Sequence, residues 1–178
     1  MSAGITVYFA HGKESGPWGR KIRALAAVAQ ELGFGVESPD YSFTQDPDER
    51  VQHLISLQPP TGRELILVGS SMGGYVAAMA SRQLQPAGLF LMAPALYMPG
   101  YEGEPEPRAD LIEVVHGWRD DLIPAQNSWR FCRAHGARLH VIDSEHTLND
   151  SIGFLESVFA RFLRDCDESR SALSDSSA

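Results

Sequence analysis

The stretch GSSMGG at residues 69–74 follows the apolar run ELILV at residues 64–68 and opens a helical segment rich in small residues. This order predicts a buried strand, a tight turn and a helix that packs closely on the sheet. Gly69, Ser71 and Gly73 fit the pattern G-x-S-x-G, in which a serine stands at the tip of a strained strand-to-helix turn. The positions two before and two after that serine come so close together that side chains would collide there. The spacing therefore selects Ser71 as the exposed hydroxyl of this turn.

The same turn has a second interpretation. A glycine-rich turn with serines can be a simple helix N-cap or a loop that binds a phosphate group. Neither G-x-G-x-x-G nor a phosphate loop ending in Lys-Ser/Thr is present, which weakens the nucleotide-binding version. The neighbouring Ser70 lacks the glycine pair, because Met72 lies two positions after it. A nucleophilic Ser71 and an anion-binding turn are thus the two interpretations that the local sequence leaves open.

The rest of the chain alternates short apolar runs with longer segments of helical period, which is typical of a parallel sheet covered by helices on both faces. The predicted fold class is α/β, a three-layer α/β/α sandwich with a mostly parallel sheet of about six strands. The predicted strands are the runs at 5–10, 35–39, 64–68, 88–92, 111–115 and 138–142, and the predicted helices are the segments at 19–33, 46–58, 72–84, 124–136 and 149–163. We expect one domain over residues 1–163 and a polar, disordered C-terminal tail over residues 164–178.

Composition limits the partners. The chain has 178 residues, is 43% hydrophobic and carries a formal net charge of −8, which is unfavourable for a nucleic-acid partner. The N-terminal apolar run is too short for a signal peptide, and no segment reaches the length of a membrane span, so we expect a cytoplasmic protein without membrane contact. Cys132 and Cys166 are far apart and suggest neither a disulfide framework nor a zinc site.

A serine hydroxyl is a poor nucleophile until a base removes its proton, and a histidine oriented by a carboxylate is the usual solution. Asp120 follows the fifth apolar run, and His146 follows the sixth. Both positions are strand ends at the same edge of the sheet as Ser71, and the ligand crevice of an open parallel sheet lies beyond this edge. The irregular stretch 94–110 is predicted to be a long loop there.

Three motifs resemble those of the alpha/beta-hydrolase superfamily, and specifically its small, single-domain, lidless serine esterases of bacterial type. GSSMGG resembles the nucleophile elbow, the HG pair at 11–12 the oxyanion loop, and GWRDDLIP at 117–124 the acid loop. The resemblance covers roughly residues 5 to 163, and it implies Ser71 as nucleophile, Asp120 as acid and His146 as base. Asp121 remains a rival for the acid role. The other histidines, including His116, are interpreted as packed or surface residues.

Hydrolysis also needs hydrogen-bond donors for the oxyanion of the tetrahedral intermediate. The resemblance implies the backbone amides of Met72 and Lys13. Residues near the same edge that could line an apolar substrate pocket are Trp18, Tyr97, Met98, Tyr101, Trp118 and Leu148.

The function implied is a serine hydrolase that cleaves small carboxylic esters through an acyl-enzyme, without a metal ion or an organic cofactor. The expected partner is a small-molecule ester or thioester. A thioesterase or an amidase or peptidase with the same three residues is an alternative, and so is a noncatalytic member of the fold that serves as an interaction module. The natural substrate and any protein partner are not specified by the sequence.

Overall fold

A computed structural model describes residues 4–175 of the chain. Six strands form one sheet in the order β2-β1-β3-β4-β5-β6, and each neighbouring pair is parallel. The strands are β1 (Thr6–Ala10), β2 (Gly35–Glu37), β3 (Leu65–Ser70), β4 (Gly88–Met92), β5 (Leu111–Gly117) and β6 (Arg138–Ile142). This architecture confirms the predicted fold class.

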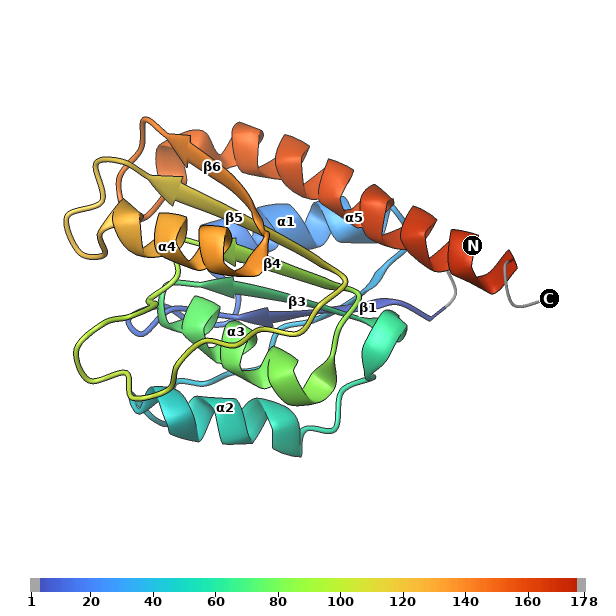
Figure 1. The fold of residues 1–178 in the computed structure, drawn as a ribbon, viewed down its shortest axis with the longest axis horizontal. Helices are drawn as coiled ribbons and strands as arrows, with labels where there is room; N and C mark the ends of the chain where they lie inside the picture. Colours follow the sequence, from blue (N-terminus) through green and yellow to red (C-terminus); the bar gives the residue numbers. More distant parts are fainter. Residues whose placement is uncertain (1–3, 176–178) are drawn as a thin grey trace.

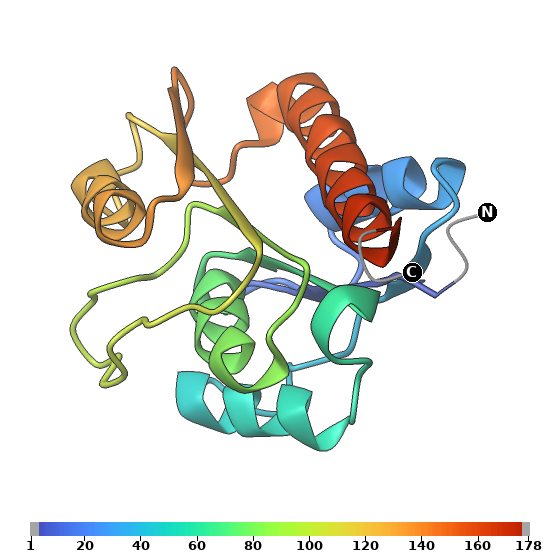
Figure 2. The ribbon, with the colours of Figure 1, turned by 45° about the vertical axis from the view of Figure 1, so that its right-hand side comes forward.

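Helices cover both faces of the sheet, as Figures 1 and 2 show. On one face α1 (Arg20–Glu31) lies beside α5 (Ile152–Asp175), and on the other lie α2 (Pro47–Ser56), α3 (Met72–Leu84) and α4 (Ala125–His135). Two short 3₁₀ helices, Gly62–Glu64 and Asn149–Ser151, precede β3 and α5. The chain moves outward from β1 to β2 and then returns to build β3 to β6 on the other side. Such a reversal of strand order leaves a crevice at the carboxyl ends of the strands.

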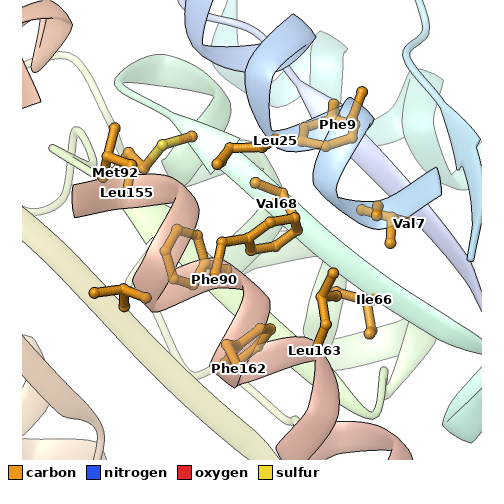
Figure 3. Close-up of a cluster of buried hydrophobic side chains, with 14 of the residues drawn as sticks. Val7, Phe9, Leu25, Ile66, Val68, Phe90, Met92, Leu155, Phe162 and Leu163 are labelled. Atoms are coloured by element: carbon orange, nitrogen blue, oxygen red, sulfur yellow. The ribbon is translucent and has the colours of Figure 1, made fainter. Parts of the chain in front are cut away.

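The two faces of the sheet bury two separate apolar clusters, because successive side chains of a strand point to opposite faces. One cluster, drawn in Figure 3, packs residues such as Val68 and Phe90 of the sheet against Leu25 of α1 and Phe162 of α5. The other packs alternate residues of β3 and β4 against α2, α3 and α4. Every residue of β3 and β4 is buried, which agrees with the continuous apolar runs that predicted these strands.

The helix ends follow local signals in the sequence. Asp46 caps α2 by accepting hydrogen bonds from the amides of Asp48 (2.8 Å) and Glu49 (3.1 Å), and Pro47 occupies the first helical position. The chain leaves α4 through Gly136, whose φ of 64° favours glycine.

The C-terminal helix is longer than the sequence predicts. The expected disordered tail at 164–178 is helical through Asp175, and residues 176–178 lie outside the described residues. Cys166 anchors this part: it is buried, and a Cβ atom on Gly88 of β4 would lie 2.7 Å from its Sγ. Cys132 is buried as well, and both cysteines are free thiols. Across residues 4–175, none of the helices combines the length and the apolar character needed to cross a membrane.

Candidate active site

Ser71 stands between β3 and α3 in a strained conformation. Its φ of 55° and ψ of −120° lie in a region that residues with a side chain seldom adopt. A Cβ atom on Gly69 would overlap the carbonyl group of Gly73, and one on Gly73 would overlap the carbonyl group of Ala10. Both glycines are therefore required by the close approach of backbone to backbone, which is the steric reason that the sequence motif anticipates.

The turn is fastened to the end of the neighbouring strand. The Ser71 amide donates to the carbonyl of Met92 over 3.0 Å, and the Ser71 carbonyl accepts from the amide of Ala95 over 2.9 Å. Both partners belong to the end of β4 or to the loop that follows it. The backbone of the Ser71 turn is thus fixed to the end of β4 and to the start of the loop that follows it.

Ser71, His146 and Asp120 form a hydrogen-bonded chain across three strand ends. His146 Nε2 lies 3.1 Å from Ser71 Oγ, and His146 Nδ1 lies 2.7 Å from Asp120 Oδ2. Because an ionised carboxylate only accepts hydrogen bonds, the proton of a neutral imidazole resides on Nδ1. Nε2 is then free to accept from the serine hydroxyl. This is the arrangement in which a histidine can act as a base toward a serine.

Asp120 is held ionised by its surroundings. Its side chain is fully buried, and Oδ1 accepts from the amides of Leu122 (2.9 Å) and Ile123 (2.8 Å). Burial alone raises the pKa of a carboxyl group, but the hydrogen bonds from Ile123 and His146 outweigh it and lower the pKa of Asp120. Asp121, the rival in the sequence, is exposed, and it is Asp120 that contacts His146.

His116 is a second histidine on the same carboxylate. Its Nε2 lies 3.1 Å from Asp120 Oδ2 and 3.0 Å from the carbonyl of Ile123, while its Nδ1 lies 2.7 Å from Ser128 Oγ. Since Asp120 and Ile123 offer only acceptors, Nε2 carries the proton. Burial lowers the pKa of His116, so the ring is neutral at pH 7 and accepts the Ser128 hydroxyl proton at Nδ1. The sequence assigns His116 no part in a site, and its only signal is a place four residues before Asp120.

A buried arginine braces the loop after β1. Arg50 of α2 is 1% exposed, and its Nη atoms donate to the carbonyls of His11 (3.3 Å), Gly12 (3.1 Å) and Lys13 (3.5 Å). In a trans peptide the carbonyl and the following amide point in opposite directions. With the Gly12 carbonyl held by Arg50, the Lys13 amide points away from Arg50.

His11 also binds the Gly12 carbonyl of this loop. Its Nδ1 lies 2.8 Å from the carbonyl of Gly12, and its Nε2 accepts from the amide of Tyr41 over 2.9 Å. The imidazole is therefore neutral with its proton on Nδ1, and burial lowers its pKa. His11 therefore links the loop after β1 to the backbone at Tyr41. Gly12 is close to Ser71, since a Cβ atom on it would lie 3.5 Å from Ser71 Cβ.

The Met72 amide follows Ser71 directly in the chain. Met72 is the first residue of α3. The first amides of a helix have no acceptor within it, and the positive end of the helix dipole lies there. The Met72 and Lys13 amides therefore belong to the two segments that flank Ser71.

A cavity of about 670 Å³ opens over Ser71 and His146. Of the residues expected to line it, Met98 and Tyr101 do so. Trp18, Tyr97, Trp118 and Leu148 do not contribute to its wall. The apolar part of the wall comes instead from Ile22, Ala95, Leu122 and Ile123.

The four residues that do not line the cavity lie elsewhere in the structure: Trp18, Tyr97, Trp118 and Leu148. Leu148 is fully buried in the apolar cluster that also contains Val68 and Phe90. Tyr97 packs against the Arg130 guanidinium, whose Cζ lies 3.8 Å from the centre of the Tyr97 ring. Trp118 is 67% exposed and donates to Asp143 over 2.9 Å, and Trp18 is 44% exposed. Within residues 4–175, no group of three or more His, Cys, Asp or Glu side chains is arranged to hold a metal ion.

Comparisons with known proteins agree with this architecture. The model of the alpha/beta hydrolase family matches residues 7–174. A solved structure from Xanthomonas campestris pv. campestris, assigned to the alpha/beta hydrolase superfamily, is 34% identical with a TM-score of 0.80, and the match covers 90% of this chain and 98% of that one.

Two more distant structures share the fold. A serine hydrolase without a lid from Xanthomonas campestris is 19% identical with a TM-score of 0.69, covering 91% of this chain and 82% of that one. An esterase from Pyrococcus furiosus is 16% identical with a TM-score of 0.71, covering 92% and 82%. A comparison with curated protein sequences found no significant match. With its family model matched over nearly the whole length, the chain belongs to the alpha/beta hydrolase family.

Proposed function

We propose that the chain is a serine hydrolase that cleaves small carboxylic esters through an acyl-enzyme. The observation that carries the proposal is the hydrogen-bonded chain from Ser71 through His146 to Asp120, with distances of 3.1 Å and 2.7 Å, beneath an open cavity. Membership of the alpha/beta hydrolase family and the fold shared with an esterase support it. A thioester would be attacked by the same groups.

In the first half of the reaction, Ser71 Oγ attacks the ester carbonyl while His146 Nε2 takes the hydroxyl proton. The new C–O bond leaves a tetrahedral intermediate with a negative oxygen, for which the Met72 and Lys13 amides are the proposed donors. Its collapse breaks the bond to the alcohol, and His146 returns the proton to the leaving oxygen. The acyl group then remains on Ser71.

In the second half, His146 removes a proton from a water molecule, which attacks the acyl-enzyme. Collapse of the second intermediate releases the carboxylic acid and returns the proton to Ser71. Asp120 fixes the Nδ1–H tautomer and stabilises the imidazolium that forms twice in the cycle. The strained serine turn and the buried carboxylate hold these groups in place before substrate arrives, so little reorganisation is needed.

The test compares two adjacent serines. Hydrolysis of 4-nitrophenyl acetate should fall on the order of a million-fold in kcat in Ser71→Ala, with circular dichroism unchanged. A fluorophosphonate probe should label the parent protein and Ser70→Ala, the matched control, but not Ser71→Ala. If Ser71→Ala keeps most of the activity, or if the probe labels it as well as the parent, the proposed function is wrong.

A further inference from the structure

The charge of the cavity is opposite in sign to that of the whole chain. The protein has 15 Lys and Arg against 23 Asp and Glu. The charged residues that line the cavity are Lys13, Arg20 and Lys21 against one carboxylate, Glu14. A cleft lined by one sign of charge concentrates ligands of the opposite sign. An acidic protein with a basic cleft therefore favours an anionic ligand at this place.

Of the three cationic side chains that line the cavity, Lys21 is the least exposed. It is the second residue of α1 and is partly buried, whereas Lys13 and Arg20 are exposed at the rim. Within the described chain, its ammonium group makes neither a hydrogen bond nor a close ion pair. The charge of Asp120 acts on it only from a longer distance. The wall of the cavity thus contains an ammonium group that has no hydrogen-bond partner in the described part of the chain.

A partly buried ammonium group without a partner is costly, because it has lost part of its hydration. Burial lowers the pKa of Lys21 to about 8, against a smaller opposing effect of Asp120, so the group is still mostly protonated at pH 7. An anion that enters the cavity would restore the missing hydrogen bonds and form a charge-assisted pair away from bulk water. Ile22, Met98 and Leu122 offer apolar surface to the rest of such a ligand.

We propose that the cavity takes esters whose nonreacting part carries a carboxylate, and that Lys21 binds this carboxylate while Ser71 attacks the ester carbonyl. This inference rests on the proposed ester hydrolysis and narrows its substrate class. Lys13 and Arg20 at the rim attract the anion, and Lys21 holds it. A singly charged carboxylate matches the single positive charge of the Lys21 ammonium group.

The experiment uses two pairs of esters that differ in one charge. 4-Acetoxybenzoate and the neutral 4-acetoxybenzamide place the difference on the alcohol side, and mono-4-nitrophenyl adipate and its methyl-capped diester place it on the acyl side. For each pair the measured quantity is the ratio of kcat/KM for the anionic ester to that for the neutral ester. Since the members of a pair differ in intrinsic reactivity, the decisive result is the change of this ratio between protein variants.

Three variants isolate the contribution of Lys21. Lys21→Met keeps the length of the side chain without its charge and should lower the ratio about tenfold or more in at least one pair. Lys21→Arg keeps the charge and should retain most of the ratio. Arg23→Met is the matched control, since it removes a charge from the same helix at an exposed side chain that contacts the Trp18 carbonyl outside the cavity. It should leave the ratio unchanged.

The outcomes separate this inference from the function on which it rests. If the parent protein hydrolyses the esters but Lys21→Met keeps the parent ratios in both pairs, the inference is wrong and the proposed function stands. A loss of the ratio in Arg23→Met equal to that in Lys21→Met would also overturn it, because it would reflect net charge alone. If the parent hydrolyses none of the four esters, the proposed function fails, and the inference fails with it.

Discussion

His116 and His146 both contact the same oxygen of Asp120, at 3.1 Å from Nε2 of the first and 2.7 Å from Nδ1 of the second. Asp120 and His116 are both fully buried. The Oδ2 atom therefore receives a fixed donor from β5 in addition to the imidazole that faces Ser71. We interpret His116 as a positioning residue, which holds the carboxylate in the orientation that His146 requires.

The first prediction concerns this contact. His116→Phe keeps an aromatic ring but removes the donor, and kcat for 4-nitrophenyl acetate should fall about tenfold or more with little change in KM, since a hydrogen bond to a charged group contributes about 1.5–3 kcal/mol. His116→Gln retains an N–H donor and should recover part of the lost kcat. Equal kcat values for the two variants would show that the N–H donor of His116 has no positioning role.

The second prediction concerns stability against acid. Burial lowers the folded-state pKa of both His11 and His116 below the ordinary value of 6.5. Arg50 also disfavours a charged His11, whereas Asp40 and Asp120 oppose the shifts of His11 and His116 in part. As the pH falls below about 6.5, the unfolded chain binds protons that the folded chain does not. The free energy of unfolding should therefore decrease, by up to about 1.4 kcal/mol per pH unit for each histidine.

Urea unfolding at pH 7.5, 6.5 and 5.5 measures this slope. This window spans the ordinary pKa of histidine. His116→Gln removes one of the two groups and should flatten the slope. A free energy of unfolding that stays constant from pH 7.5 to 5.5 would contradict the lowered pKa values.

The site residues that could be predicted from the sequence are those whose positions depend on a local steric rule or on the order of the strands. The G-x-S-x-G spacing anticipates Ser71 because only glycine at positions 69 and 73 avoids a collision of backbone with backbone. Asp120 and His146 could be located because parallel strands bring their carboxyl ends to one edge. Each of these inferences depends on topology and short spacings, which a sequence displays directly.

The substrate cavity could not be predicted in the same way, because its wall depends on the direction in which side chains leave their backbones. Leu148 follows β6 as expected, but a φ of 55° and the turn after it bring its side chain into the core. In the sequence, Lys21 is one of several polar residues of the helix predicted at 19–33, and nothing there indicates that its side chain lines the cavity. The continuation of the C-terminal helix beyond residue 163 could not be predicted either, because the contact of Cys166 with β4 joins segments far apart in the chain.

The third prediction concerns the buried arginine beneath the loop after β1. Arg50→Met would leave three carbonyls, those of His11, Gly12 and Lys13, without their charged donor. We expect the free energy of unfolding to fall by about 1–3 kcal/mol and kcat to fall at least tenfold, because the Lys13 amide loses its brace. Urea unfolding and ester hydrolysis measure the two effects.

The control for this prediction is a surface arginine. Arg63 pairs with Asp110 over 3.5 Å, and both side chains are largely exposed. Arg63→Met should cost less than about 1 kcal/mol and leave kcat unchanged. If Arg50→Met is as stable and as active as Arg63→Met, the brace has no energetic importance.

The last prediction tests the steric rule at the serine turn with two alanine substitutions. In Gly73→Ala the new Cβ would overlap the Ala10 carbonyl, so β1 and α3 would have to move apart, with a loss of several kcal/mol of stability and of fluorophosphonate labelling at Ser71. Gly153→Ala near the start of α5 adds the same atom into open space and should stabilise the protein by up to about 1 kcal/mol, because alanine favours a helix. Thermal unfolding and probe labelling of both variants give the comparison. Parent-like labelling in Gly73→Ala would mean that the turn can relax without displacing its serine, and the requirement for glycine at this position would be wrong.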